Sequence, residues 1–323
     1  SALMQNHSVS LSGGTAKSNY YVSMSFMADP GWYKDSKVRR YTANFNATHH
    51  LLDNLSLTLL ASASYRKQQA PGTLAQDVDV ISGQVKRDFD INPFSYALGT
   101  SRTLRPYNAD GTLAYYRNNW APFNILNEYA NNSTHVDVLD FKLQAEGSYQ
   151  LTADLALKPL FSVRRANTIT THEVNEGSNV VQAFRANDNP TVAQDNIYLV
   201  RDKDNPLQQP KVGLTHGGLF NRTETSMTSV LARLALDFDK RIGQHDLKAF
   251  AFSEVRVANR TNQPFQGYGI QYDRGNQVYT NPLIFDKLTN EGNAYFGLHK
   301  RNERGVTFSL NGTYGYAGKY VFN

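Results

Sequence analysis

The stretch LSLTLLASASYR, residues 55–66, decides the fold of this chain, because apolar and polar side chains alternate along it. Its apolar parity consists of Leu55, Leu57, Leu59, Ala61, Ala63 and Tyr65. Residues 139–149 and 306–316 alternate in the same way. Successive side chains of a β-strand point to opposite faces of the sheet, so this pattern predicts strands with one apolar and one polar face.

The same reasoning predicts ten strands, separated by connections of two very different lengths. We place the strands near residues 5–12, 19–28, 37–49, 54–67, 135–150, 154–168, 223–239, 244–258, 303–316 and from 319 onward. Short turns alternate with three long loops, near residues 68–134, 169–222 and 259–302. In an antiparallel sheet every second connection lies at the same edge, so the long loops are all expected at one end of the strands.

Composition restricts the class of protein. The 323 residues carry a formal net charge of +5 without the basic stripe that nucleic acid requires, so we expect no nucleic-acid partner. The absence of cysteine excludes disulfides and thiol chemistry. No stretch approaches the run of about 18 apolar residues that a membrane-spanning helix requires. If the chain crosses a membrane, it must therefore do so with strands.

Short turns at one rim and long loops at the other are typical of outer-membrane proteins. We predict an all-β fold, a partial antiparallel transmembrane β-barrel with short periplasmic turns and long extracellular loops, in which residues 1–323 form one domain. The chain begins inside one predicted strand and stops inside another, so we interpret it as part of a longer polypeptide. The alternative is a soluble all-β binding protein that buries its apolar faces beneath a second sheet.

Residues 5–15 (QNHSVSLSGGT), 19–25 (NYYVSMS) and 39–46 (RRYTANFN) carry a resemblance to the SusC/RagA family of TonB-dependent outer-membrane transporters. The first two stretches resemble the hairpin that follows the plug domain of that family, and the third resembles its next strand. Residues 122–127 (PFNILN) are similar to an Asn-Pro motif of the first long loop, although Ala121 precedes the proline where Asn is typical. Residues 314–320 (YGYAGKY) are similar to a later hairpin of the family.

This resemblance implies a barrel of about 22 strands with a plugged lumen, of which the chain would supply roughly the first half. It also implies location in the outer membrane of a Gram-negative bacterium, in contact with outer-membrane lipid. The expected function is active import of oligosaccharides or peptides, with a SusD-like surface lipoprotein as partner and the TonB complex acting through an N-terminal region. The alternative is a passive porin or a surface-adhesion barrel, and an upstream plug domain and TonB box would decide between them.

Aromatic residues are frequent in the predicted extracellular loops, where flat rings suit the apolar faces of sugars and also anchor protein interfaces. The candidate substrate-binding residues are Tyr96, Tyr107, Tyr115, Tyr116, Trp120, Tyr129, Tyr268 and Tyr272. Nearby amides add hydrogen-bond donors and acceptors: Asn118, Asn119, Asn124 and Asn127. The alternative is that these side chains pack the loops against one another.

A second group of candidates carries charge on the polar parity of the strands, where we expect the side chains to face the lumen: Arg66, Lys142, Glu146, Arg164 and Arg233. No catalytic constellation stands out, so we expect neither an enzyme nor a cofactor. His49 and His50 would point to opposite faces of one strand and cannot bind one metal together. Residues 202–205 are rich in oxygen ligands but lack the glycine and distal glutamate of an EF-hand, so we expect a polar turn and no metal.

Overall fold

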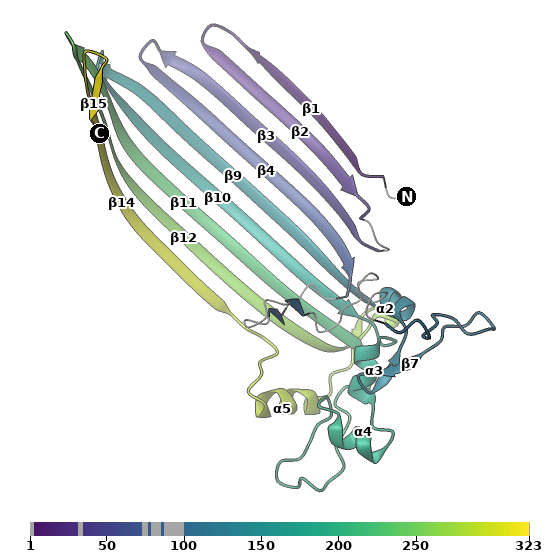
Figure 1. Cartoon of the computed structure of the whole chain (residues 1–323). Helices are drawn as coiled ribbons and strands as arrows, with labels where there is room; N and C mark the ends of the chain where they lie inside the picture. Colours follow the sequence, from purple (N-terminus) through teal and green to yellow (C-terminus); the bar gives the residue numbers. More distant parts are fainter. Residues whose placement is uncertain (1–2, 32–34, 73–76, 79–84, 87–99, 323) are drawn as a thin grey trace.

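The computed structural model describes residues 3–31, 35–72, 77–78, 85–86 and 100–322. In it, one antiparallel sheet of 11 strands runs through the molecule (Figure 1). The strands that pair in chain order are β1 (Gln5–Gly14), β2 (Ser18–Asp29), β3 (Lys37–Leu52), β4 (Leu55–Pro71), β9 (Asn132–Thr152), β10 (Leu155–Val174), β11 (Gly218–Ile242), β12 (His245–Gln271), β14 (His299–Tyr316) and β15 (Tyr320–Phe322). The short strand β13 (Gln277–Val278) pairs with β12. The ten strands predicted from the sequence are confirmed.

Short turns and long loops lie at opposite ends of this sheet (Figure 1). We call these ends the turn rim and the loop rim. Turns of two or three residues join β1 to β2, β3 to β4, β9 to β10, β11 to β12 and β14 to β15. The connections 175–217 and 272–298 lie at the loop rim, together with the described parts of the connections 30–36 and 72–131. This sidedness agrees with the alternation of short and long connections in the sequence.

The loop rim carries the helices and most of the buried apolar residues. Its elements are β5 (Asp77–Val78), β6 (Val85–Lys86), β7 (Tyr116–Asn118), β8 (Ala121–Phe123), α2 (Ile125–Asn131), α3 (Asn179–Arg185), α4 (Pro190–Asp195), η1 (Tyr272–Arg274) and α5 (Pro282–Asn290). One buried cluster contains Val174, Val180, Val181, Leu214 and Leu219, and a second contains Phe123 and Ile125. Among the described residues, none of the helices is long and apolar enough to span a membrane.

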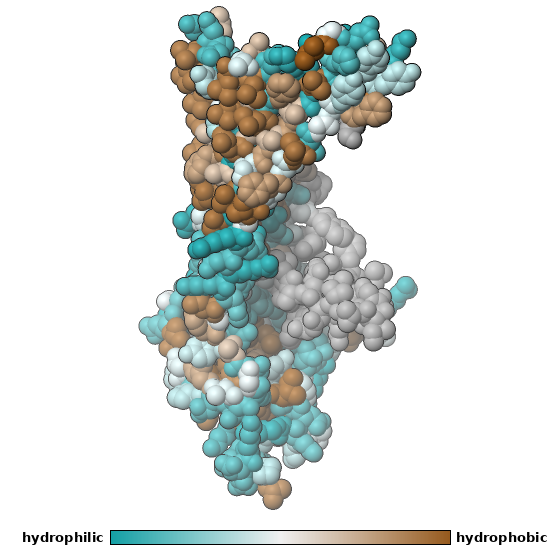
Figure 2. Space-filling view, turned by 90° about the vertical axis from the view of Figure 1, so that its left-hand side faces the viewer, coloured by the Kyte–Doolittle hydropathy of each residue, from teal (hydrophilic) through white to brown (hydrophobic). Residues whose placement is uncertain are grey.

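The pairing register shows that the apolar parities of neighbouring strands share one face of the sheet. Leu59 of β4 pairs with Ala145 of β9, which pairs with Phe161 of β10. Along β14, Phe308 and Leu310 are each 77% exposed, and within the described residues no second layer covers them. Figure 2 shows the apolar side chains as a band, bounded by hydrophilic surface toward the loop rim. The fold is therefore a partial transmembrane β-barrel whose apolar face is directed outward.

The strands extend further toward the loop rim than their sequence pattern indicates. β12 is predicted to end near residue 258 but continues to Gln271, and β11 begins at Gly218 instead of near residue 223. At about 3.4 Å per residue, the 27 residues of β12 far exceed an apolar band that is about 25 Å tall. Beyond the band residues 259–262 (NRTN) are polar on both parities of the strand, so pairing continues there without the alternation.

Candidate functional site

A two-residue turn shapes the first long loop. Asn119 and Trp120 connect β7 to β8, with φ angles of 47° and 63°. Two consecutive positive φ angles are typical of a type I′ hairpin turn. A bulky side chain rarely adopts this conformation, so Trp120 is held against a steric cost. Its ring contacts the ring of Tyr198 edge-on in the second long loop, with centroids 5.8 Å apart, and this contact helps to offset the cost.

Asn124 organises the rest of the first loop. Its Oδ1 caps helix α2 by accepting the backbone N–H of Leu126 at 2.9 Å. Its Nδ2 donates to the carbonyl oxygens of Pro106 at 2.9 Å and Ala114 at 2.7 Å. The side chain is buried and uses both of its polar atoms within the loop. Asn124 therefore positions the site and does not face a ligand.

Asn179, at the first turn of α3, joins the second loop to the first. Its Nδ2 donates to the carbonyl oxygens of Asn118 at 2.8 Å, and of Ala121 and Pro122 at 3.1 Å each. Its backbone N–H donates to Oε1 of Glu128 in α2 at 2.8 Å. Asn179 and Glu128 are both fully buried. One asparagine thus fixes the β7–β8 hairpin and helix α2 against helix α3.

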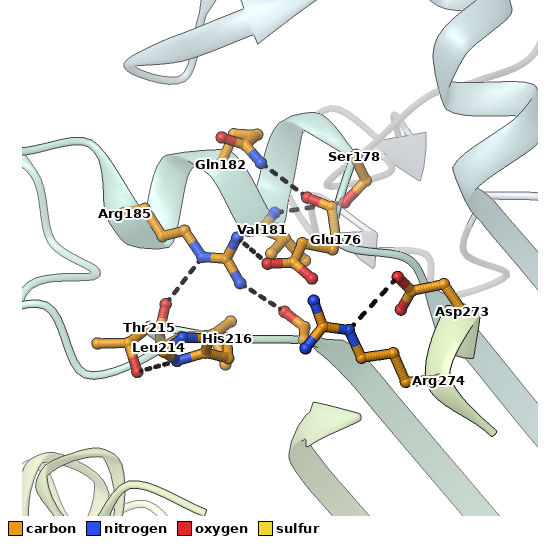
Figure 3. Close-up of polar contacts among 11 residues, drawn as sticks. Glu176, Ser178, Val181, Gln182, Arg185, Leu214, Thr215, His216, Asp273 and Arg274 are labelled. Atoms are coloured by element: carbon orange, nitrogen blue, oxygen red, sulfur yellow. Dashed lines mark hydrogen bonds and ion pairs between the residues drawn. The ribbon is translucent and has the colours of Figure 1, made fainter. Parts of the chain in front are cut away.

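Arg185, at the end of α3, fixes the second loop to itself (Figure 3). Its Nε donates to the carbonyl oxygen of Leu214 at 3.0 Å. Its two terminal nitrogens donate to Oε1 of Glu176 at 2.6 Å and to the carbonyl oxygen of Gly217 at 2.8 Å. The planar guanidinium satisfies three acceptors from three parts of the loop, which lysine could not do with the same geometry.

Tyr198 stands between the two loops. Its ring stacks on the ring of Phe184 of α3, with centroids 4.5 Å apart, and also contacts the ring of Trp120 from the first loop. The backbone before it is fixed by Asn196, whose Nδ2 donates to the carbonyl oxygens of Ala183 and Ala186 at 2.8 Å each. The aromatic contacts therefore rest on a backbone that is itself held by buried amides.

These contacts surround a cavity of about 620 Å³ between the first and second loops. Its wall includes Tyr115, Tyr116 and Trp120, three of the residues that the sequence analysis selected. Arg117 and Asp188, one from each loop, also line it and form an ion pair, in which Nη2 of Arg117 donates to both carboxylate oxygens of Asp188 at 2.9 and 2.8 Å. The cavity combines aromatic surface with one exposed charge of each sign, as sites for small polar ligands commonly do.

The Arg117–Asp188 pair is suited to exchange with a ligand. The two side chains are 51% and 61% exposed. Exposed ion pairs contribute only about 0–1 kcal/mol to stability. A carboxylate or ammonium group of a ligand can therefore replace one partner at small cost. Peptide termini carry these two groups.

The other predicted aromatic residues lie elsewhere. Tyr96 is outside the described residues. Tyr107 is exposed and pairs with Leu113 within its own loop. Tyr129 packs against the cluster of Phe123 and Ile125. Tyr268 contacts the rings of Phe184 and Phe285, and Tyr272 donates its hydroxyl to the carbonyl oxygen of Leu219 at 2.7 Å. Substrate binding by all eight predicted aromatic residues, including the three that line the cavity, stays a prediction.

The pairing register places Arg66, Lys142, Glu146, Arg164 and Arg233 on the polar face of the sheet, opposite the apolar band. Arg164 donates to Asp140 from Nε at 3.0 Å, and Arg233 donates to Glu254 from Nε at 2.8 Å. Both pairs join neighbouring strands. A role for these charges in conduction or in contact with a plug stays a prediction.

The candidate metal ligands form no metal site. His49 contacts the hydroxyl of Ser18 through Nδ1 at 2.5 Å. Asp202 accepts the backbone N–H groups of Asp204 and Asn205 at 2.9 and 3.3 Å, which is the polar turn that the sequence predicts. In the part of the chain that the structure describes, no three His, Asp or Glu residues are grouped as a metal site would require.

Burial raises the pKa of Glu128 above its ordinary value, despite the hydrogen bond from the backbone of Asn179. The folded loop therefore binds a proton more tightly than the unfolded chain, so its stability falls as the pH rises from the unfolded pKa of about 4.3 toward the raised folded pKa. We expect Glu128→Gln to remove this slope while keeping an acceptor for Asn179. Hydrogen exchange of the α2 and α3 amides across this pH range measures it.

Asp110 in the same loop is expected to show the opposite dependence of stability on pH. Hydrogen bonds from the hydroxyl and backbone N–H of Thr112 lower the pKa of Asp110. Asp110 therefore contributes to folding stability above its unfolded pKa, and this contribution is lost as the pH falls through its lowered folded pKa. An unchanged pH slope in Glu128→Gln would contradict the assignment to Glu128.

Several residues that build the cavity were not selected from the sequence: Arg117, Asn179, Arg185 and Asp188. No local pattern distinguishes a buried, bridging asparagine from an exposed loop asparagine. The one available signal was indirect, because both loops combine aromatic residues with an unusual density of Asn.

No protein-family model matches the sequence, and no curated protein matches it. Among solved structures, the chain is similar to the structure of the RagAB peptide importer in the "closed-closed" state, with a TM-score of 0.62 and 15% sequence identity over 98% of this chain. It is similarly related to a structure of the RagAB peptide transporter, with a TM-score of 0.61 and 14% identity. In both cases it covers 30% of the matched chain. At this identity the likeness shows the fold alone: the chain has the architecture of part of a β-barrel of this kind.

Proposed function

We propose that this chain is part of the barrel of a TonB-dependent importer in the outer membrane, which takes up peptides or oligosaccharides together with a SusD-like surface lipoprotein. The observation that carries the proposal is the match of 98% of the chain to the RagAB importer fold. The open sheet, the outward apolar band and the gathering of the long loops at one rim agree with it. The protein would act by transport and not by catalysis.

The cavity between the first and second loops supports a binding role for the loop rim. Its rings offer flat apolar surface, and Arg117 and Asp188 offer one charge of each sign. The matched structures are described as a peptide importer, and peptides carry both apolar side chains and terminal charges. Peptides are therefore the cargo that we test first, with oligosaccharides as the comparison.

Energised import is tested in cells that express the full-length protein and its partner lipoprotein. We expect labelled peptides to accumulate only when the gene is present, and a protonophore or removal of the TonB box to abolish accumulation. Uptake that persists at the same rate without a proton-motive force would identify a passive porin instead. Surface binding without any accumulation would identify an adhesion barrel.

Trp120 is the cavity residue with the clearest expected effect on binding. Aromatic anchors at interfaces commonly contribute 1–2 kcal/mol or more, so we expect Trp120→Ala to weaken cargo binding by about tenfold. Trp120→Phe keeps a ring for Tyr198 and should retain most of the affinity. Calorimetric titration of the full-length complex with a panel of peptides and glycans measures this.

Tyr107 provides the matched comparison, because it is an exposed aromatic residue of the same loop that does not line the cavity. We expect Tyr107→Ala to leave the affinity within about twofold of the wild type. If Tyr107→Ala weakened binding as much as Trp120→Ala, the cavity would not be the binding site.

A further inference from the structure

Basic residues border the outward apolar band on the side of the loop rim. On β3, β4, β10 and β14 the first outward-facing residue beyond the apolar stretch is basic, and all four are exposed: Arg39, Lys67, Arg165 and Arg304. Near the turn rim, the last regularly paired outward-facing residues of the same four strands include no Lys, Arg, Asp or Glu: His49, Leu55, Leu155 and Tyr316. The outward positive charge on these strands is thus confined to the edge of the band nearest the loops.

Two of these basic side chains, Arg39 and Lys67, lie on β3 and β4, and Lys37 adds a third. Arg39 pairs directly with Lys67 in the register, and Lys37 lies two residues further along β3. Like charges directly opposite each other in a sheet are unfavourable. Among the described residues, no acidic side chain lies within ion-pair distance of Lys37, Arg39 or Lys67. An anion between Arg39 and Lys67 would relieve this repulsion.

A cleft of about 390 Å³ surrounds these three bases. Two acidic residues, Asp137 and Glu173, line it as well. Asp137 of β9 pairs directly with Lys67 in the register and accepts a hydrogen bond from the hydroxyl of Tyr65 at 3.2 Å. Lys67 lies over the ring of Tyr65, with its Nζ 5.6 Å from the centroid. The basic side chains of Arg39 and Lys67 therefore lie next to the rings of Tyr41 and Tyr65, on the loop-rim side of these rings.

An apolar groove of about 540 Å³ continues from these rings into the membrane band. The rings of Phe26, Tyr41 and Tyr65 form a row across β2, β3 and β4 at the end of the groove nearest the loop rim. The centroid distances between successive rings are 5.0 Å and 6.5 Å. Leu139 of β9 pairs with Tyr65 and extends this row, and Val9 and Met24 line the groove further toward the turn rim. A groove of this kind beside exposed cations matches the two parts of an anionic lipid, an acyl chain and a charged headgroup.

We propose that this outward face binds a phosphate-bearing lipid of the leaflet nearest the loops, with one acyl chain along the groove and the headgroup phosphate between Arg39 and Lys67. The proposal rests on the membrane-spanning fold and is independent of whether the barrel imports a cargo. The occupant is a lipid and not free phosphate, because the cations are continuous with the apolar groove. Arginine suits phosphate through its planar pair of donors, and lysine adds a second charge.

The experiment uses the full-length protein in nanodiscs of zwitterionic phosphatidylcholine, with lipid A as the phosphorylated probe. Native mass spectrometry counts bound lipid A in the wild type and in Arg39→Gln/Lys67→Gln. A basic residue near a membrane surface contributes enough attraction that we expect the double variant to bind on the order of thirtyfold more weakly. Dephosphorylated lipid A should bind both proteins equally weakly, and inorganic phosphate should not displace bound lipid A.

Arg40→Gln/Arg66→Gln is the matched control. Arg40 follows Arg39 on β3, and Arg66 precedes Lys67 on β4. The two arginines pair directly with each other, but they face the opposite side of the sheet. We expect this variant to bind lipid A as the wild type does. Three results would each overturn the proposal: equal binding by the tested variant, equal binding of dephosphorylated lipid A to the wild type, and displacement by inorganic phosphate.

Discussion

Leu143→Arg is expected to destabilise the folded protein in a lipid bilayer by about 2–4 kcal/mol, which is the cost of a basic side chain on the lipid face near the midplane. Leu143 lies midway along the outward apolar stretch of β9, between Ala61 of β4 and Val163 of β10. In bulk water the same exposed position would accept arginine at little cost. The measurement is denaturant unfolding of the full-length protein in phosphatidylcholine vesicles.

Gln144→Arg is the control, since Gln144 is the next residue of the same strand and lies on the polar face. There the new charge meets water and the carboxylate of Glu146, so we expect a change below about 1 kcal/mol. Equal costs for the two variants would mean that both faces of β9 meet the same environment. A sheet covered by protein on both sides would give that result, and the barrel would then be excluded.

The strands could be predicted because a membrane barrel imposes two different solvents on its two faces. Lipid outside and water inside require strict alternation, as in residues 55–66 and 139–149. The prediction loses accuracy where this contrast ends. β12 continues past residue 258 and β11 begins before residue 223 through residues without this alternation, so β12 is predicted to end too early and β11 to begin too late.

The cavity could be predicted only in part. Tyr115, Tyr116 and Trp120 were selected because aromatic residues in loops suggest binding, and they do line one cavity. Tyr268 belongs to the same class of residue but packs against Phe184 and Phe285. Sequence composition does not separate these two outcomes, because the difference depends on contacts between loops about 60 or more residues apart in the chain.

Those contacts converge on Asn179, and this gives the second large prediction. Asn179→Ala is expected to destabilise the packing of the two loops by about 2–4 kcal/mol, because it leaves buried carbonyl oxygens without their donor. The carbonyls of Asn118, Ala121 and Pro122 all accept from its Nδ2. The expected readouts are faster hydrogen exchange of the β7–β8 hairpin and loss of cargo binding in the cavity, with unchanged exchange in the middle of the sheet.

Asn179→Asp makes the test sharper because it conserves shape and replaces the donor by an acceptor. A carboxylate at this buried position would face three carbonyl oxygens, so its cost should exceed that of alanine. Gln182→Ala is the control: Gln182 lies on the same helix and lines the same cavity, but it makes one side-chain bond, to the carbonyl of Glu176 at 2.8 Å. We expect it to cost less than about 1.5 kcal/mol. If Asn179→Asp were tolerated as well as Gln182→Ala, the loops would be held by their aromatic contacts, and the amide would be incidental.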